Sequence, residues 1–254
     1  MAPDDPVPTL IGSVQRALRL LEAAASHRGG APAKQLARES RVALPTAYHL
    51  LRTLVHEGYV RRERGVYLLA EATEGLACAA AQQNRRGRIH DALAHCRDVL
   101  GVPVYFGVYR DGEIELAAVA DSPAHPAIEE WVDFRETGHA HALGQCLLSQ
   151  LGEKARRDHL HRHPVRYVTP YSVRDEETFL RRLAAVDRMQ PVLEHQEYAL
   201  GTVCAAMPLM AGSTAMAIGF SLPAHQEDRL LPTLARLERE VGKLLGTLGF
   251  SISI

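Results

Sequence analysis

The chain has 254 residues, of which 46% are hydrophobic and 23% are charged, so it is neither a disordered nor a collagen-like protein. Its 29 Lys and Arg residues nearly cancel its 30 Asp and Glu residues, and the net charge of −1 does not by itself indicate a nucleic-acid-binding protein. The four cysteines form no C-x-x-C pair, and the first residues lack an apolar signal segment. These features predict reduced thiols and a cytoplasmic location.

One segment departs from this neutral balance. Residues 13–66 contain ten basic and four acidic side chains, a local charge of +6 that leaves −7 for the rest of the chain. Such an asymmetry is typical of a polyanion-binding module joined to a neutral or acidic partner. The alternative is an ordinary solvated surface of charged side chains.

Apolar residues within this segment follow helical spacing in three successive stretches. The first helix is predicted to begin with Ser13 as its N-cap and to end at Gly29-Gly30. Its apolar face is predicted to comprise Val14, Ala17, Leu18, Leu21, Ala24 and Ala25. A short second helix begins at Pro32, and a third begins near Pro45 and ends near Gly58. Two short helices around a tight turn predict a helix-turn-helix.

Two β-prone runs, Tyr59-Val60 and Val66–Leu69, follow the third helix and are separated by the basic segment Arg61–Gly65. A hairpin with a basic tip in this position is a wing. A winged helix-turn-helix is expected to place its third helix in the major groove of DNA and its wing on the phosphates. Arginine contacts both bases and phosphates, so the role of Arg52 stays open between the two. The candidate DNA contacts are Gln15, Arg16, Lys34, Gln35, Thr46, Tyr48, His49, Arg52, Arg61, Arg62 and Arg64.

Several stretches resemble one bacterial family, the IclR-type transcriptional regulators. Residues 13–22 (SVQRALRLLE), residues 44–59 (LPTAYHLLRTLVHEGY) and the wing are similar to the winged helix-turn-helix of that family. Residues 142–148 (ALGQCLL) resemble its A-x-G-K-A-L-L helix start, and residues 197–208 (EYALGTVCAAMP) resemble its E-x-x-x-G-x-x-C-x-A-x-P signature. The resemblance therefore covers nearly the whole chain.

The resemblance implies an α+β protein in three parts. These are a winged helix-turn-helix DNA-binding domain over residues 8–73, a linker helix region over residues 74–88, and a GAF-like effector-binding domain over residues 89–254. It further implies a homodimer or dimer of dimers that binds double-stranded DNA at a palindromic operator, under the control of a small-molecule effector. It implies no cofactor and no membrane partner.

Periodicity in the second half is consistent with a mixed fold. Residues 102–109 and 113–120 are β-prone and are separated by Arg110-Asp111-Gly112, which is a hairpin signal, and residues 131–134 predict a third strand. Residues 175–189 predict a helix, and leucines at helical spacing between residues 230 and 248 predict a long C-terminal helix. An antiparallel sheet with flanking helices makes this domain α+β.

Residues 199–224 contain no charged side chain, and a helix of this length would span a bilayer. Pro208 and the Gly212-Ser213 pair interrupt the stretch, and the flanking runs 203–210 and 215–222 each have the length of a strand. Two buried strands joined by a Gly-Ser turn are therefore predicted instead of a membrane span.

The effector site is implied by the resemblance alone. Family members that bind small carboxylates hold them between the sheet and the helix that starts at the A-x-G motif, where free N–H groups suit an anion. The corresponding residues here are Ile128, Ala142, Leu143, Glu194, Cys204 and Ser221. The chain departs from the family at Leu143, where a small residue is usual, and at Gly219, where a second serine is usual. A smaller, less polar cavity is therefore expected, for a small organic acid, an aromatic compound or no ligand, and Cys204 is as readily a buried core residue as a ligand contact.

The other chemistry-bearing residues favour no further site. The clusters His139-x-His141 and His159-x-His161-x-His163 have the i,i+2 spacing that suits a divalent metal on a strand, but a solvated loop more often carries such a cluster, and no metal site is predicted. The sequence contains no G-x-S-x-G, H-E-x-x-H, G-x-G-x-x-G or P-loop, so no catalytic residue is predicted. The prediction is an effector-responsive DNA-binding regulator. The alternative is a small-molecule sensor or enzyme whose winged helix mediates protein contacts.

Overall fold

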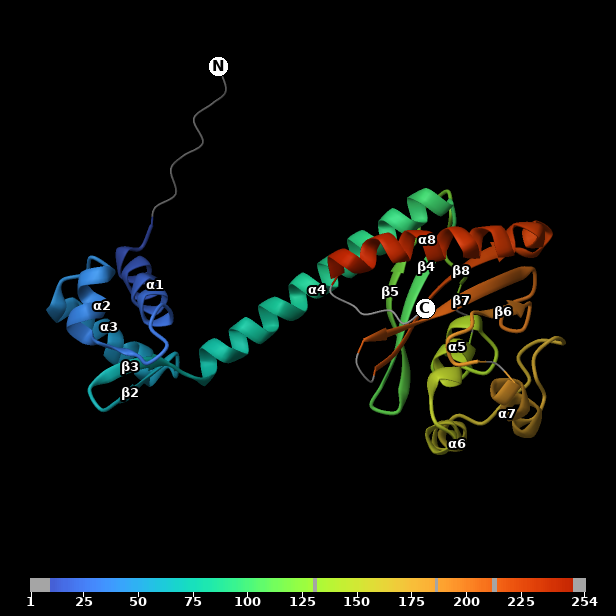
Figure 1. Cartoon of the computed structure of the whole chain (residues 1–254), viewed down its shortest axis with the longest axis horizontal. Helices are drawn as coiled ribbons and strands as arrows, with labels where there is room; N and C mark the ends of the chain where they lie inside the picture. Colours follow the sequence, from blue (N-terminus) through green and yellow to red (C-terminus); the bar gives the residue numbers. More distant parts are fainter. Residues whose placement is uncertain (1–9, 130–131, 186, 212–213, 249–254) are drawn as a thin grey trace, which may run out of the picture. The chain divides into compact units, whose positions relative to one another are not determined.

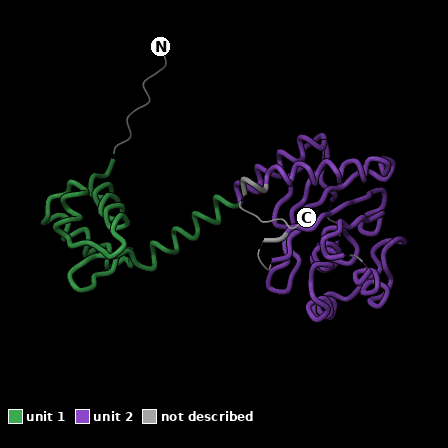
Figure 2. The backbone as a smooth tube through the Cα atoms, in the orientation of Figure 1, with its two compact units in different colours: residues 1–85 green, residues 86–254 purple. Residues whose placement is uncertain are grey.

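The structure, a computed structural model, describes residues 10–129, 132–185, 187–211 and 214–248. The chain divides into two compact units, residues 1–85 and residues 86–254 (Figure 2). Each unit has its own buried core.

The first unit is a three-helix domain with a small antiparallel sheet (Figure 1). Its elements are α1 (Gly12–Ala25), β1 (Ala31–Pro32), α2 (Ala33–Glu39), α3 (Leu44–His56), β2 (Val60–Glu63) and β3 (Val66–Leu69), with the strands in the order β1-β3-β2. Leu20, Leu36 and Leu51 are fully buried where the three helices meet. The helix-turn-helix and the wing hairpin predicted from the sequence are both present.

The beginning and the outer face of α1 differ from the prediction. The helix begins at Gly12 after an extended Ile11, and no side chain caps it, so the prediction of Ser13 as the N-cap is wrong. Val14 and Leu18 were expected on the apolar face but are 52% and 53% exposed. Successive residues of an α-helix are 100° apart around its axis, so Val14 and Leu18 each lie more than a quarter turn from the buried Leu20. The part of the domain that covers Leu20 therefore does not cover these two side chains.

One long helix, α4 (Glu71–Leu100), follows the wing. It contains both the predicted linker segment, residues 74–88, and the apolar positions that follow it. Its last three turns bury Leu93, Cys96 and Leu100 in the second unit. The earlier turns are exposed, as the Ala-rich and polar sequence of residues 77–88 requires.

The second unit is a five-stranded antiparallel sheet with helices on both faces (Figure 1). After α4 its elements are β4 (Val104–Arg110), β5 (Glu113–Ala120), α5 (Ala142–Gln150), α6 (Glu153–Arg162), α7 (Glu176–Ala185), β6 (Val192–His195), β7 (Thr202–Ala211), β8 (Thr214–Pro223), η1 (Ala224–Arg229) and α8 (Leu230–Leu248). The strand order is β5-β4-β8-β7-β6. The α+β prediction is confirmed.

Alternation along the strands separates the core of this unit into two layers. On one face, Phe106, Ala205 and Phe220 pack with the end of α4 and with α8. On the other face, Cys204 and Ala206 pack with α5 and α7. The leucines predicted to stripe the C-terminal helix fit this arrangement, since Leu230, Leu234 and Leu237 are buried in the first layer.

The uncharged stretch of residues 199–224 contains β7 and β8, as predicted. The two strands pair along their whole length, from Thr202 opposite Pro223 to Ala211 opposite Thr214. Helices cover both faces of this central pair, which explains the absence of charge. None of the helices in the described part of the chain combines the length and the apolar composition that a membrane-spanning helix requires.

The third strand predicted at residues 131–134 is not formed. Val132–Phe134 lies in a bend and turn, and Trp131 is outside the described residues. Phe134 instead packs against the layer that contains α5, so its apolar character reflects burial in a loop.

Candidate functional site

The outward face of α3 presents polar side chains in the arrangement expected of a recognition helix. Tyr48, His49 and Arg52 are exposed, while Thr46 is half-buried near the beginning of the helix. The Arg52 guanidinium (Nη2) lies 3.3 Å from His49 Nδ1, one turn away. Ala47, Leu51 and Leu54 bury the opposite face, so packing against α1 and α2 fixes which side of α3 is free.

The wing is a tighter hairpin than the sequence indicated. Arg61 and Arg62 lie within β2, and the turn consists only of Arg64 and Gly65, both with positive φ (48° and 87°). Two consecutive positive φ angles are characteristic of a type I′ turn, which matches the twist of the strands it joins. The sequence suggested a longer basic tip, but the pairing of Glu63 with Val66 leaves room for only two residues.

The wing arginines differ in their surroundings. All three are exposed. Arg61 pairs with Glu63, and the Arg62 guanidinium lies 5.8 Å from the centre of the Tyr67 ring. Arg64, at the turn, has no acidic partner within the described residues. The three wing arginines, Lys34, His49 and Arg52 are together called the basic face.

The remaining predicted DNA contacts lie on α1 and α2. Lys34 and Arg16 are exposed, and Arg16 donates to the Gly12 carbonyl on its own helix. Gln35 is half-buried and donates to Glu39 at 3.0 Å, and Glu39 also pairs with His27. The structure thus leaves Lys34 more accessible than Gln35.

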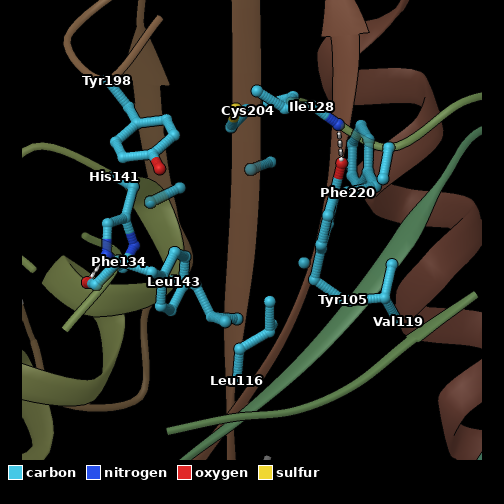
Figure 3. A pocket seen from close by; sticks show the side chains of 14 residues that line it. Tyr105, Leu116, Val119, Ile128, Phe134, His141, Leu143, Tyr198, Cys204 and Phe220 are labelled. Carbon is cyan, nitrogen blue, oxygen red and sulfur yellow. Dashed lines mark hydrogen bonds between the residues drawn. The ribbon is translucent and has the colours of Figure 1, made fainter. Parts of the chain in front are cut away.

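A cavity of about 110 Å³ lies in the second unit, between the sheet and the beginning of α5 (Figure 3). Its aromatic lining residues are Tyr105, Phe134, His141, Tyr198 and Phe220, and it is called the aromatic cavity below. Aliphatic side chains complete the wall: Leu116, Val119, Ile128 and Leu143. It is mainly an apolar space with a few polar groups at its edge.

Three aromatic rings form one wall of this cavity. The Phe134 ring stacks on the His141 ring with centroids 3.8 Å apart, and Tyr198 meets His141 edge-on at 5.5 Å. The Tyr198 hydroxyl donates to the Val132 carbonyl at 3.0 Å. These contacts join Tyr198 to a segment more than 50 residues earlier in the chain, and they give this side of the cavity an aromatic surface.

His141 is the N-cap of α5. Its Nδ1 accepts a hydrogen bond from the Gly144 N–H (2.8 Å), and its Nε2 bonds to the Phe134 carbonyl (3.0 Å). An acceptor at Nδ1 and a donor at Nε2 define the neutral tautomer. Burial lowers the pKa of His141 to about 3, so the ring is uncharged at neutral pH.

A polar contact closes the other side of the cavity. The Tyr105 hydroxyl accepts a hydrogen bond from the Ile128 N–H at 2.8 Å and lies 3.1 Å from the Ser221 hydroxyl. Burial raises the pKa of Tyr105. Ser221 contacts the hydroxyl of the lining residue Tyr105 but does not itself line the cavity.

Glu194 lies behind Cys204, its register partner across β6 and β7. The carboxyl is fully buried, and its Oε1 accepts hydrogen bonds from the N–H groups of Glu197 and Tyr198. Burial raises its pKa to about 7, although these bonds and the Cys204 thiol oppose the shift. Glu194 thus fixes the turn that carries Tyr198 and lies outside the lining.

This burial predicts a pH-dependent effect of Glu194→Gln. A carboxyl whose pKa rises from 4.5 to about 7 on folding destabilises the folded state progressively as pH rises through that window. Glutamine cannot ionise, so the variant should gain about 1–3 kcal/mol in free energy of unfolding relative to the wild type between pH 5 and pH 8.5. Urea denaturation at the two pH values measures the change, with the exposed Glu238→Gln as control. A stability difference that does not vary with pH would contradict the prediction.

Of the six effector residues implied by the resemblance, Ile128, Ala142, Leu143 and Cys204 line the aromatic cavity, and Glu194 and Ser221 lie one layer behind it. Their contact with an effector stays a prediction. The aromatic lining was not predicted from the sequence. One signal was available, because His141 directly precedes the helix start and Tyr198 lies within the quoted signature.

Most of the clustered histidines are not on a solvated loop, although His161 on α6 is exposed. His139, His141 and His159 are buried, and His139 Nε2 and His159 Nδ1 lie within hydrogen-bond distance of the carbonyls of Arg166 and Gly112. His163 pairs with Glu113 at 2.6 Å. Among the described residues, no group of three or more His, Cys, Asp or Glu side chains is arranged to hold a metal ion.

Comparison with known families places the chain. Residues 13–64 match the model of the IclR helix-turn-helix domain, and residues 86–237 match that of the bacterial transcriptional regulator IclR C-terminal domain. The chain belongs to the IclR family of bacterial transcriptional regulators. A curated relative, the p-hydroxybenzoate hydroxylase transcriptional activator of Acinetobacter baylyi, is 23% identical in an alignment of length 252 that covers 92% of each protein.

Solved structures of this IclR-family fold are similar along nearly the whole chain. An IclR homologue from Microbacterium hydrocarbonoxydans, complexed with 4-hydroxybenzoate, has 20% identity and a TM-score of 0.57, covering 93% of this chain and 99% of that one. The Thermotoga maritima IclR has 16% identity and a TM-score of 0.57, with coverage of 94% and 99%. At these identities the similarity shows the fold, and the fold is the one that the residues predicted.

Proposed function

We propose that this IclR-family regulator binds a palindromic operator as a homodimer or dimer of dimers, and that a small aromatic effector in the aromatic cavity controls its affinity for DNA. The observation that carries the effector is the aromatic wall beside an apolar space of single-ring size, in which Phe134 stacks on His141 and Tyr198 meets His141 edge-on. The relatives named for p-hydroxybenzoate hydroxylase and complexed with 4-hydroxybenzoate support an aromatic ligand. The protein acts in the cytoplasm, without enzymatic activity.

The basic face is the DNA-binding surface in this proposal. α3 enters the major groove, where Tyr48, His49 and Arg52 reach base edges, while the wing arginines contact the flanking phosphates. Residues 8–73 form the DNA-binding domain, residues 74–88 the linker region and residues 89–254 the effector domain. α4 is one continuous helix that begins after the wing and ends in the core of the effector domain. It therefore connects the DNA-binding domain directly to the effector domain.

Regulation requires that the effector bind one arrangement of the protein more tightly than another. A ligand in the aromatic cavity contacts Tyr198, His141 and Leu143, and so couples the β6–β7 turn to the beginning of α5. An allosteric coupling of about 1–3 kcal/mol, which is typical of allosteric proteins in general, corresponds to a 5- to 150-fold change in operator affinity. The direction of this change decides between repression and activation by the effector.

Footprinting the full-length protein on DNA upstream of the neighbouring genes, with and without aromatic compounds, tests this function. Protection of a palindromic site that changes with an aromatic compound is expected, and binding should weaken steeply as salt rises. If the protein fails to bind DNA even at low salt, the winged helix mediates protein contacts, and the proposal is wrong. If it binds DNA but no aromatic compound alters the binding, the effector part alone is wrong.

Arg52→Ala is expected to weaken operator binding by roughly 1–3 kcal/mol and to relax specificity at one base pair, because Arg52 lies on the exposed face of α3. Electrophoretic mobility shift with operator variants measures both effects, and Arg19→Ala, an exposed arginine on α1, is the control. An equal loss on operator and random DNA would reassign Arg52 to a phosphate. Unchanged binding to both would exclude a DNA contact.

A further inference from the structure

Among the described residues that line the aromatic cavity, no side chain carries a charge that could balance a charged ligand. None of its described lining residues is lysine or arginine. His141 is the one basic side chain among the described lining residues, and its burial and its two hydrogen bonds keep it neutral. An ion that enters an apolar space loses its hydration, and without a counter-charge that loss is not recovered.

The polar groups of the lining already have partners. The Tyr198 hydroxyl donates to Val132, and the Tyr105 hydroxyl is engaged by Ile128 and Ser221. The Cys204 thiol faces the Glu194 carboxyl, and the proximity of that carboxyl adds to the rise in the pKa of Cys204 that burial causes. An anionic ligand beside Cys204 would therefore approach a buried carboxyl and not a cation.

The beginning of α5 offers two weak donors. His141 holds the N–H of Gly144, and the N–H groups of Ala142 and Leu143 donate to no described residue, as is usual in a first helical turn. Two amides can satisfy a neutral acceptor such as an amide, ketone or phenol oxygen. They compensate a full negative charge only in part, because the helix end carries about half an elementary charge.

From this lining we infer that the aromatic cavity selects an uncharged, single-ring aromatic molecule with one hydrogen-bond acceptor, and discriminates against both carboxylates and cations. The inference rests on the proposed function and names its ligand class. The size limits the ligand to a single ring, because the cavity of about 110 Å³ is smaller than an apolar cavity of about 150 Å³ that accommodates benzene. A substituent on the ring therefore has to lie at the rim, where the lining residue Leu116 is 37% exposed.

Benzamide, benzoate and benzamidinium have nearly the same shape but differ in charge. Comparing their affinities therefore distinguishes the effect of ligand charge from the effect of ligand size. Calorimetry with the full-length protein at pH 7.5 should show benzamide binding, with the two ions at least tenfold weaker. If benzoate or benzamidinium binds as tightly as benzamide, the inference is overturned while an aromatic effector stands. If none of the three binds, the inference is overturned as well, and footprinting with other aromatic compounds then decides the proposed function separately.

Two variants of one loop test whether benzamide binds in the aromatic cavity. Ala127 lines the aromatic cavity, and Ala124, three residues earlier in the same loop, is exposed and does not line it. Ala127→Trp should fill the space and weaken benzamide binding at least tenfold, whereas Ala124→Trp should leave it within twofold. Equal affinity in the two variants would place the probe elsewhere and overturn the assignment.

A charge introduced at the rim tests the cause directly. Leu116 lines the aromatic cavity and is 37% exposed, so a longer side chain there can reach the ligand from solvent. Leu116→Arg should strengthen benzoate binding at least tenfold relative to Leu116→Gln, and should leave benzamide binding in the two variants within threefold. If arginine and glutamine have the same effect on benzoate, the missing counter-charge is not the cause of the discrimination.

Discussion

Replacement of Arg61, Arg62 and Arg64 together with glutamine is expected to weaken DNA binding on the order of 100-fold at about 0.15 M salt, equally on operator and random DNA. The three side chains are exposed on one hairpin, and Arg64 has no acidic partner among the described residues. Each phosphate contact that is lost removes about 0.9 from the slope of log K against log salt. The slope should therefore become shallower by about 2.7 per wing if all three contact phosphates.

Fluorescence anisotropy with labelled DNA across a salt series measures this slope. The matched control is the triple glutamine variant of Arg157, Arg174 and Arg181, exposed arginines in the second unit, because it removes the same charge from a different surface. The control should leave the slope unchanged. A wing variant with the wild-type slope would show that the wing does not touch the DNA backbone.

Gly144→Ala is expected to destabilise the second unit by about 3–5 kcal/mol and to abolish ligand binding in the aromatic cavity. A Cβ at this position would lie 2.5 Å from the Cα of Gly138 and 2.6 Å from the His141 ring, and closer still to the Gly138 carbonyl oxygen. Backbone atoms cannot rotate away, so α5 or the turn before it must shift. Such a shift breaks the bond from the Gly144 N–H to His141 that caps α5.

The control is Gly75→Ala in α4, where an added Cβ meets nothing within 4 Å. There alanine should stabilise the helix by about 0.5–1 kcal/mol, since glycine is costly inside a helix. Chemical denaturation of both variants measures the contrast. If Gly144→Ala unfolds at the same denaturant concentration as the wild type, the close approach of α5 to the Gly138 turn is wrong.

The sequence by itself determined the local structure and the fold class. Helical spacing and the breakers Gly29-Gly30, Pro45 and Gly58 located the first three helices, because a helix needs only its own periodicity and end signals. The absence of charge over residues 199–224, with breakers in the middle, identified the central strand pair. The family motifs then connected the two halves.

Features that depend on contacts between distant segments were decided only by the tertiary structure. The apolar pattern of α1 could not show that Val14 is exposed. A side chain on a helix is buried only where another segment of the fold packs against it, and the sequence of α1 does not contain that information. The clustered histidines were expected on a solvated loop, and the fold instead buries His139 and His159 against backbone carbonyls.

The aromatic cavity is the clearest case of such a decision. Its wall joins a strand residue, Tyr105, to a loop residue, Phe134, and to Tyr198 in a turn more than 60 positions further along the chain. No local periodicity relates these positions. Their meeting depends on the strand order and on the His141 cap, which brings the beginning of α5 against the sheet. The polarity of the cavity, and so the class of ligand that it admits, is a property of that packing.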